Sequence, residues 1–146
     1  MADSSELPTI VPMLSYEDVA RAIDWLTRAF GFREIENERY TEPGGKVSHA
    51  EMRLGGGAIM LGSPSPHYEG PRRHAESCEA ARRWREPGYV VDGVHVLVED
   101  VDAHFRRAKE AGATILSEPE DQPYQERVYR VEDLDGHRWM FGQPIP

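Results

Sequence analysis

Three side chains that could bind a metal ion or move a proton lie in alternating stretches of the sequence. His49 and Glu51 are two residues apart, so in a strand they would share one face. His95 stands between Val94 and Val96 in a second alternating stretch. Imidazole and carboxylate groups bind divalent cations, and imidazole suits general acid–base catalysis near neutral pH. His49, Glu51 and His95 could therefore chelate a metal, His95 could act alone, or both histidines could simply pack at a sheet surface.

The single cysteine offers a weaker chemical signal. Cys78 has no second cysteine with which to form an internal disulfide, which fits a reducing compartment. His74 lies four residues earlier, but an ordinary side chain in a linker is the favoured interpretation. The first residues lack the features of a signal peptide, and no apolar run approaches the roughly 18 residues of a membrane span. A cytoplasmic protein with no membrane partner is the expectation.

Composition limits the partners further. The 146 residues suffice for one domain or for two small modules with a shared core. The net charge is −9, and the basic cluster at 72–85 is interleaved with glutamates, which predicts a solvated face. Nucleic-acid binding needs clustered Lys and Arg without such interruption. No nucleic-acid partner is expected.

Two stretches near the ends of the two halves nearly repeat each other. Met60 corresponds to Met140 and Gly62 to Gly142, each pair 80 residues apart. Such self-similarity predicts a duplicated module. In the first module, strands are expected at 9–14, 32–40, 47–54 and 58–62, with a helix from the Asp18 cap to Gly31. In the second, strands are expected at 93–98, 114–116, 127–131 and 137–141, with a helix from Asp100 to Gly112.

The elements thus follow the order β-α-β-β-β twice. The expected organisation is a loose N-terminus at 1–7, a first module at 8–64, a linker or lid at 65–90 with a short helix at 76–85, and a second module at 91–146.

Several stretches of the sequence resemble the vicinal oxygen chelate superfamily. They are the strand-to-helix junctions at 14–19 and 97–102, the helix ends at 29–32 and 109–113, and the closing stretch at 131–137. This superfamily includes glyoxalase I, extradiol dioxygenases and bleomycin-type antibiotic-binding proteins. The stretch 49–54 is similar to its PhnB-like branch, whereas Leu134 departs from the proline usual at that place. The resemblance covers about residues 8–64 and 91–144. It implies an α+β fold in which two βαβββ modules form a cup-shaped half-barrel sheet, a small-molecule ligand in the concave cup, and a homodimer.

Metal-dependent members of this superfamily bind a divalent cation through the first and last strands of each module. The resemblance places those positions at Val11, Met60, Gly93 and Met140. None of the four carries a usual ligand for such an ion, and a thioether suits copper(I) instead. No cofactor is therefore expected, and a divalent metal remains possible but disfavoured.

Side-chain alternation predicts the lining of the cup. The inward-facing residues are expected to be Val11, Met13, Met60, His95, Leu97, Arg138 and Met140. Trp139 and Phe141 should instead face the helices. Tyr124 and Arg127 resemble a Tyr-Gly-x-Arg stretch of the PhnB-like branch and are expected either at the cup mouth or in loop packing. The linker aromatics Tyr68, Trp84 and Tyr89 could form a lid or cover the join between modules, and His104 is expected to be solvated.

A mostly apolar lining with flexible methionines suits an apolar or aromatic ligand. The leading hypothesis is a metal-independent binder that acts by sequestration or resistance. The alternative is a lyase, isomerase or dioxygenase that uses the displaced metal site His49–Glu51–His95 or acid–base chemistry at His95.

Overall fold

A computed structural model describes residues 7–86 and 92–146, so the predictions for 1–6 and for 87–91, including Tyr89, lie outside the described residues. The chain divides into two compact units, Met1–Glu69 and Gly70–Pro146. Each unit contains one βαβββ module, which confirms the predicted α+β fold class.

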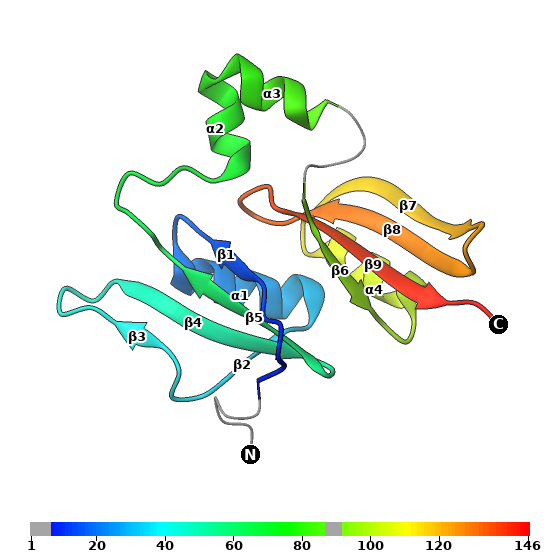
Figure 1. Cartoon of the computed structure of the whole chain (residues 1–146), viewed down its shortest axis with the longest axis horizontal. Coiled ribbons are helices and arrows are strands. Elements are labelled where there is room, and N and C mark those ends of the chain that lie inside the picture. Colours follow the sequence, from blue (N-terminus) through cyan, green and yellow to red (C-terminus); the bar gives the residue numbers. More distant parts are fainter. Residues whose placement is uncertain (1–6, 87–91) are drawn as a thin grey trace. The chain divides into compact units, whose positions relative to one another are not determined.

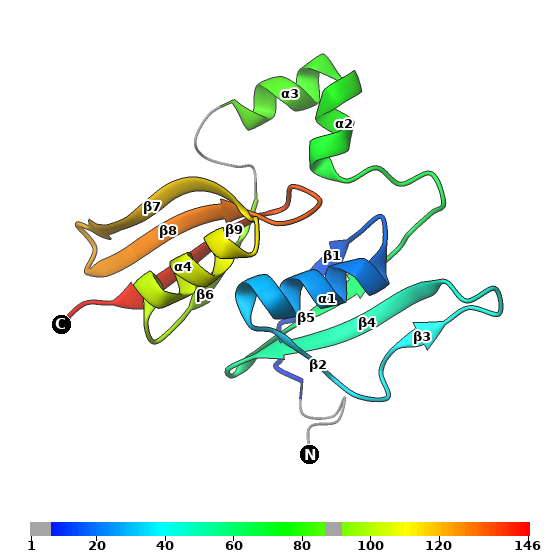
Figure 2. The same cartoon turned by 180° about the vertical axis from the view of Figure 1, so that it is seen from behind.

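The first unit is a sheet covered on one face by a single helix (Figures 1 and 2). Its elements are β1 (Met13–Ser15), α1 (Val19–Phe30), β2 (Arg33–Glu34), β3 (Tyr40–Thr41), β4 (Val47–Leu54) and β5 (Gly57–Gly62). The strand order is β1-β5-β4-β2, with β3 also paired to β4. β1 runs parallel to β5, and the other pairs are antiparallel.

Helix α1 has the ends that the sequence predicts. The Asp18 side chain accepts a hydrogen bond from the backbone N–H of Arg21 at 3.1 Å, and Gly31 ends the helix with φ of 86°. The buried face of the helix includes Val19, Ile23 and Leu26. These residues carry the apolar periodicity, so the pattern and the packing agree.

The second unit repeats this arrangement and adds two short helices (Figure 1). Its elements are α2 (Pro71–Ser77), α3 (Glu79–Arg85), β6 (Val94–Leu97), α4 (Val101–Glu110), β7 (Thr114–Gln122), β8 (Glu126–Glu132) and β9 (Arg138–Pro144). The strand order is β6-β9-β8-β7, with β6 parallel to β9. This order matches that of the first unit strand for strand, as a duplication requires.

Several predicted boundaries were wrong. The strand expected at 9–14 is reduced to β1, because Pro12 lacks an N–H for the ladder. The strand expected at 32–40 is split into β2 and β3, with Asn37 between them at φ of 69°. β7 continues well past residue 116, through two shifts of register. The single helix expected at 76–85 is two helices that meet at Cys78.

Alternation along β9 separates two faces, as predicted. Trp139 and Phe141 are fully buried, and the Phe141 ring lies 4.1 Å from the His104 ring of α4. Arg138, Met140 and Gly142 therefore belong to the opposite face, which we call the open face of the sheet. The open face of the first unit is defined in the same way, as the face opposite α1.

Candidate ligand-binding sites

A buried carboxylate holds the two linker helices against the second sheet. Glu132, at the end of β8, is 3% exposed. Its oxygens lie 2.7 Å from Arg85 Nη2 on α3, 3.2 Å from Arg72 Nη2 on α2 and 3.2 Å from Arg138 Nε on β9. A buried charge needs such partners, because desolvation costs several kcal/mol. We call these four residues the Glu132 network.

The same arginines also hold the turn between β8 and β9. Arg72 donates to the carbonyls of Asp133 and Leu134, both at 2.8 Å. Arg85 donates to the carbonyl of Gly136 at 3.2 Å. A Cβ atom at Gly136 would lie 2.8 Å from the backbone nitrogen of Arg72, so only glycine permits this approach. The prediction of a solvated basic face was therefore wrong for Arg72 and Arg85.

Asp133 fixes the turn from within. It is 1% exposed, and its Oδ1 accepts hydrogen bonds from the backbone N–H groups of Asp135 and His137 at 3.1 and 3.0 Å. Its Oδ2 accepts a hydrogen bond from Trp139 Nε1 at 3.0 Å. A carboxylate that accepts several N–H bonds orders the turn that contains it. The turn presents His137 and Arg138 at the edge of a pocket.

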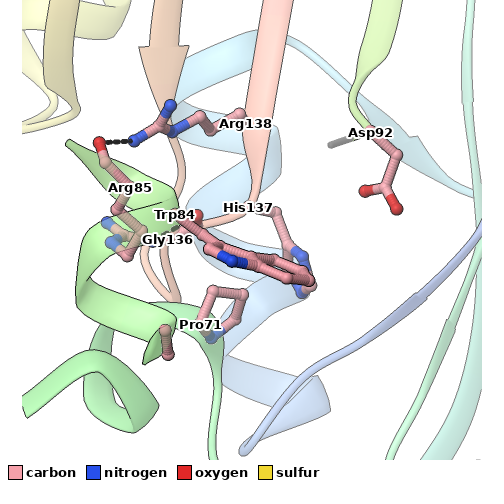
Figure 3. A pocket seen from close by; sticks show the side chains of 8 residues that line it. Pro71, Trp84, Arg85, Asp92, Gly136, His137 and Arg138 are labelled. Atoms are coloured by element: carbon pink, nitrogen blue, oxygen red, sulfur yellow. Dashed lines mark hydrogen bonds between the residues drawn. The ribbon is translucent and has the colours of Figure 1, made fainter. Parts of the chain in front are cut away.

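This pocket lies between α3 and the start of β9 and has a volume of about 200 Å³. It is lined by Pro71, Ala81, Trp84, Arg85, Asp92, Gly136, His137 and Arg138. In Figure 3 the Trp84 indole projects from α3 toward His137, and Arg138 donates to the Arg85 carbonyl at 2.7 Å. Trp84 is 67% exposed, which leaves a large aromatic surface free for a ligand. We call this the Trp84 pocket.

The open face of the second sheet carries an imidazole–carboxylate pair. His95 Nε2, on β6, lies 2.6 Å from Glu126 Oε1, on β8. The Glu126 side chain crosses β9 directly over Gly142, where a Cβ would come within 2.8 Å of its Cδ. Leu97, which is 61% exposed, and Met140, the register partner of His95, lie on the same face. The predicted alternation of β6 is confirmed, with Val94 and Val96 more buried than His95 and Leu97.

The open face of the first sheet carries a second such pair. His49 Nε2 lies 3.1 Å from Glu51 Oε2 on β4. The register places Glu51 beside Met60 and Met60 beside Met13, so the predicted residues of this face are neighbours. Met13 is 80% exposed, and Val11 lies outside any strand.

Arg127 lies on the side of β8 opposite the open face. Arg127 Nε is 3.1 Å from Asp102 Oδ1 on α4, and its Nη1 is 2.9 Å from Asp121 Oδ1. These two carboxylates raise the pKa of Arg127. Alternation places Arg127 on the α4 side of β8, with Tyr129. Tyr124, in the turn before β8, is 57% exposed.

His104 is not solvated, contrary to the expectation. Its Nδ1 lies 2.6 Å from the hydroxyl of Tyr129, and its ring packs on Phe141. Burial raises the pKa of Tyr129. His104 precedes two arginines in the sequence of α4, which suggested a polar face. Its partner Tyr129 comes from β8, so helical periodicity could not indicate the contact.

The residues at the four family metal positions do not fit a divalent cation. The side chains of Val11 and Gly93 have no donor atom, and those of Met60 and Met140 offer only thioethers. Within residues 7–86 and 92–146, no group of three or more His, Cys, Asp or Glu side chains could hold a metal. Glu51 is adjacent to His49, whereas His95 is in the other unit with Glu126.

Sequence reasoning missed the two glutamates that organise the second sheet. Glu132 stands in a turn motif after the apolar Val131, and Glu126 stands between Tyr124 and Arg127, so no local pattern marks either of them. The arginine cluster at 72–85 could have indicated these glutamates, because arginines that pack against the second sheet need carboxylate partners there.

The fold and these sites define the class of protein, and comparisons with known proteins agree. The family model described as the Glyoxalase/Bleomycin resistance protein/Dioxygenase superfamily matches residues 9–141, so the chain belongs to this superfamily. The PhnB-like branch and the homodimer stay predictions.

Two relatives share more than a third of the residues. Uncharacterized protein Rv0887c of Mycobacterium tuberculosis is 36% identical over 138 residues, 94% of this chain and 75% of the relative. The crystal structure of TioX from Micromonospora sp. ML1 is also 36% identical, covers 95% of this chain and 98% of TioX, and gives a TM-score of 0.66.

A more distant structure shares the fold. TnmS3, an antibiotic binding protein from Streptomyces sp. CB03234, is 19% identical, covers 94% of this chain and 97% of its own, and gives a TM-score of 0.59. As for membranes, residues 7–86 and 92–146 contain no helix with the length and apolar character of a membrane span.

Proposed function

We propose that the protein binds a small apolar or aromatic molecule without the help of a metal ion, and that it acts by sequestering this molecule. The observation that carries the proposal is the Trp84 pocket, in which a 67% exposed indole faces a cavity of about 200 Å³. Ligand sites are concave, contain apolar or aromatic walls and have a few fixed polar groups. Trp84 and Pro71 supply the aromatic and apolar walls, and Arg138 and His137 supply the polar groups.

The Glu132 network supports this proposal, because it fixes α3 before any ligand arrives. Arg85, the residue after Trp84, is bound at once to Glu132 and to the Gly136 carbonyl. Preorganisation of this kind reduces the entropy that binding would otherwise cost. The name of TnmS3 adds that a chain of this fold can bind an antibiotic.

Titration of the purified protein with planar aromatic probes tests the proposal. The chosen probes are an anion, 1-anilinonaphthalene-8-sulfonate, a cation, proflavine, and a neutral molecule, 2-naphthol. Trp84 is the most exposed of the three tryptophans, since Trp25 is 9% and Trp139 0% exposed, so its emission should respond most strongly to a bound probe. We expect saturable one-to-one quenching by at least one probe, unchanged after dialysis against EDTA.

The matched variants are Trp84→Ala and Trp25→Phe. Removal of an aromatic anchor typically costs 2 kcal/mol or more, so Trp84→Ala should weaken probe binding by about tenfold or more. Trp25→Phe should leave the affinity unchanged. A stoichiometric divalent metal in the untagged protein, or binding that is indifferent to Trp84, would contradict the proposal.

The His95–Glu126 pair favours a second function, an enzyme that uses acid–base chemistry. The carboxylate 2.6 Å from Nε2 would orient the imidazole for proton transfer. In that case His95 would be the catalytic residue and Glu126 a positioning residue. His95→Ala should then abolish turnover with little loss of substrate binding, whereas a binding protein should show only a modest change in affinity.

A further inference from the structure

We infer that the ligand of the Trp84 pocket is a planar aromatic anion, such as an aromatic carboxylate, whose ring lies against Trp84 and whose charged group faces Arg85. This inference rests on the proposed function, because it names the chemical class of the ligand for the same pocket. It is drawn from the charges and hydrogen-bond donors around the pocket, whereas the proposed function is drawn from the indole and the cavity.

The first observation is an excess of positive charge at the pocket wall. Three guanidinium groups surround the Glu132 carboxylate, with nitrogen–oxygen distances of 2.7 to 3.2 Å. Guanidinium groups stay charged in proteins, so three positive charges and one negative charge leave the Glu132 network with a net charge of +2. The side chains of Arg138 and Arg85 are 8% and 22% exposed, so solvent screens their charges only in part. A second anion beside them would be attracted.

The other buried carboxylate of the turn does not supply this second anion to the pocket. Asp133 accepts hydrogen bonds from the backbone N–H groups of Asp135 and His137 and from Trp139 Nε1. Its charge is therefore stabilised by three neutral donors. Asp133 is also not among the residues that line the pocket.

The second observation is an available donor on the pocket wall. Arg85 lines the pocket, and its Nη1 donates to the Gly136 carbonyl at 3.2 Å and its Nη2 to Glu132 at 2.7 Å. Its Nε–H donates to no residue in 7–86 or 92–146. The two existing bonds fix the planar guanidinium, so a ligand oxygen would meet a donor that is already in place. Hydrogen bonds between charged partners are about twice as strong as those between neutral ones.

A cationic ligand is the main alternative. The face of an exposed indole can bind a cation, and the Asp92 carboxylate lines the same pocket. Asp92 is exposed, however, so water and salt screen its charge more than they screen the charges of Arg85 and Arg138. The fixed guanidinium groups therefore outweigh the single carboxylate, and an anion is favoured.

The experiment is a calorimetric titration with two probes of the same shape, 2-naphthoate and 2-naphthamide, which differ in charge. We expect 2-naphthoate to bind at least about tenfold more tightly, because only the anion gains a charge-assisted hydrogen bond and the attraction of the network. An increase in sodium chloride from about 0.05 to 0.5 M should weaken 2-naphthoate severalfold and leave 2-naphthamide unchanged.

Two variants locate the effect. Arg85→Gln removes the donor and one charge, so it should weaken 2-naphthoate about tenfold and 2-naphthamide much less. Because Arg85 also holds α3, the second variant leaves the Glu132 network intact. Asp92→Asn removes the opposing exposed carboxylate and should strengthen 2-naphthoate about threefold without a change in 2-naphthamide. Glu118→Gln provides the control, since it makes the same charge change on β7, two strands from β9, and should alter neither affinity.

Three outcomes would overturn the inference. Equal affinities for the two probes, with both lost in Trp84→Ala, would exclude the anionic ligand and leave the proposed function intact. Tighter binding of the cation 2-naphthylmethylammonium than of 2-naphthoate would assign the pocket to a cation. Equal gains in Asp92→Asn and Glu118→Gln would attribute the effect to the net charge of the protein and not to this pocket. If no probe binds at all, the proposed function fails together with the inference.

Discussion

Two glycines in equivalent positions, Gly62 and Gly142, have opposite surroundings on the open faces of the two sheets. Over Gly142 lies the Glu126 carboxylate, 2.6 Å from His95. Within residues 7–86 and 92–146, a Cβ added at Gly62 would meet only the backbone oxygen of Ser48, at 3.9 Å. The strand order and register around the two glycines are the same. One backbone thus supports a filled surface in one unit and a free surface in the other.

The charges on the two open faces differ in the same way. Glu51 is the register partner of Met60 in the first unit, whereas Arg130 is the partner of Met140 in the second. On the helix-facing side, Ile59 and Leu61 correspond to Trp139 and Phe141, and all four are buried and apolar. Close packing constrains the helix-facing residues of both units, whereas the open faces can differ in charge.

The second unit contains the Glu132 network, in which one buried carboxylate meets three arginines. Glu132→Ala should leave the guanidinium groups of Arg72, Arg85 and Arg138 close together without their shared anion. Breaking a buried ion pair costs about 3–5 kcal/mol, and the partial exposure of Arg72 lowers this to about 3. We expect urea unfolding to show this loss in the second unit, with its backbone amides exchanging faster than those of the first.

The control for this prediction is Glu118→Ala on β7, which removes a carboxylate that is exposed. Its effect on the free energy of unfolding should be close to zero. If Glu132→Ala destabilises both units equally, or neither, then the difference between the units does not come from the Glu132 network.

The stability at high pH offers a second way to distinguish the two units, because it depends on a buried tyrosine of the second unit. Burial raises the pKa of Tyr129 above its ordinary value of 10.0, so the folded state holds the phenolic proton more tightly than the unfolded state. The stability that this provides is complete below about pH 10 and is lost as the pH rises further, by up to about 1.4 kcal/mol per pH unit. Tyr129→Phe should remove this component of the slope.

The measurement is the free energy of unfolding between pH 8 and pH 11 for the wild type, Tyr129→Phe and the control Tyr40→Phe. Tyr40→Phe changes an exposed tyrosine of the first unit and should leave the slope as it was. A Tyr129→Phe slope equal to that of the wild type would show that the unfolded state, and not the core around His104, controls the alkaline transition.

Local signals in the sequence were sufficient for the fold. The caps at Asp18 and Asp100 and the helical stripes reflect short-range geometry, and they agree with the structure. The 80-residue spacing between Met60 and Met140 reflects the repeated order of elements, which the two units also show. The two faces of β6 and β9 followed from alternation, which is fixed by strand geometry.

The sites were harder to predict because their partners are distant in the sequence. Glu132 meets Arg72 across 60 residues, and His95 meets Glu126 across strands that are not neighbours, with β9 between them. No periodicity reports such pairs.

The smallest expected effect compares the two glycines directly. Gly142→Ala should force the end of the Glu126 side chain away from His95, because the new methyl group would overlap it, and should cost about 1 kcal/mol. Gly62→Ala meets no such obstacle and should stabilise the protein by about 0.5 kcal/mol, because alanine restricts the unfolded chain. Thermal unfolding of the two variants measures the predicted loss of stability in one and the predicted gain in the other. The His95 ring resonances report the displacement of Glu126. Equal effects at the two positions would mean that Glu126 does not rest on Gly142 in solution, and the two open faces would then be more alike than their structures indicate.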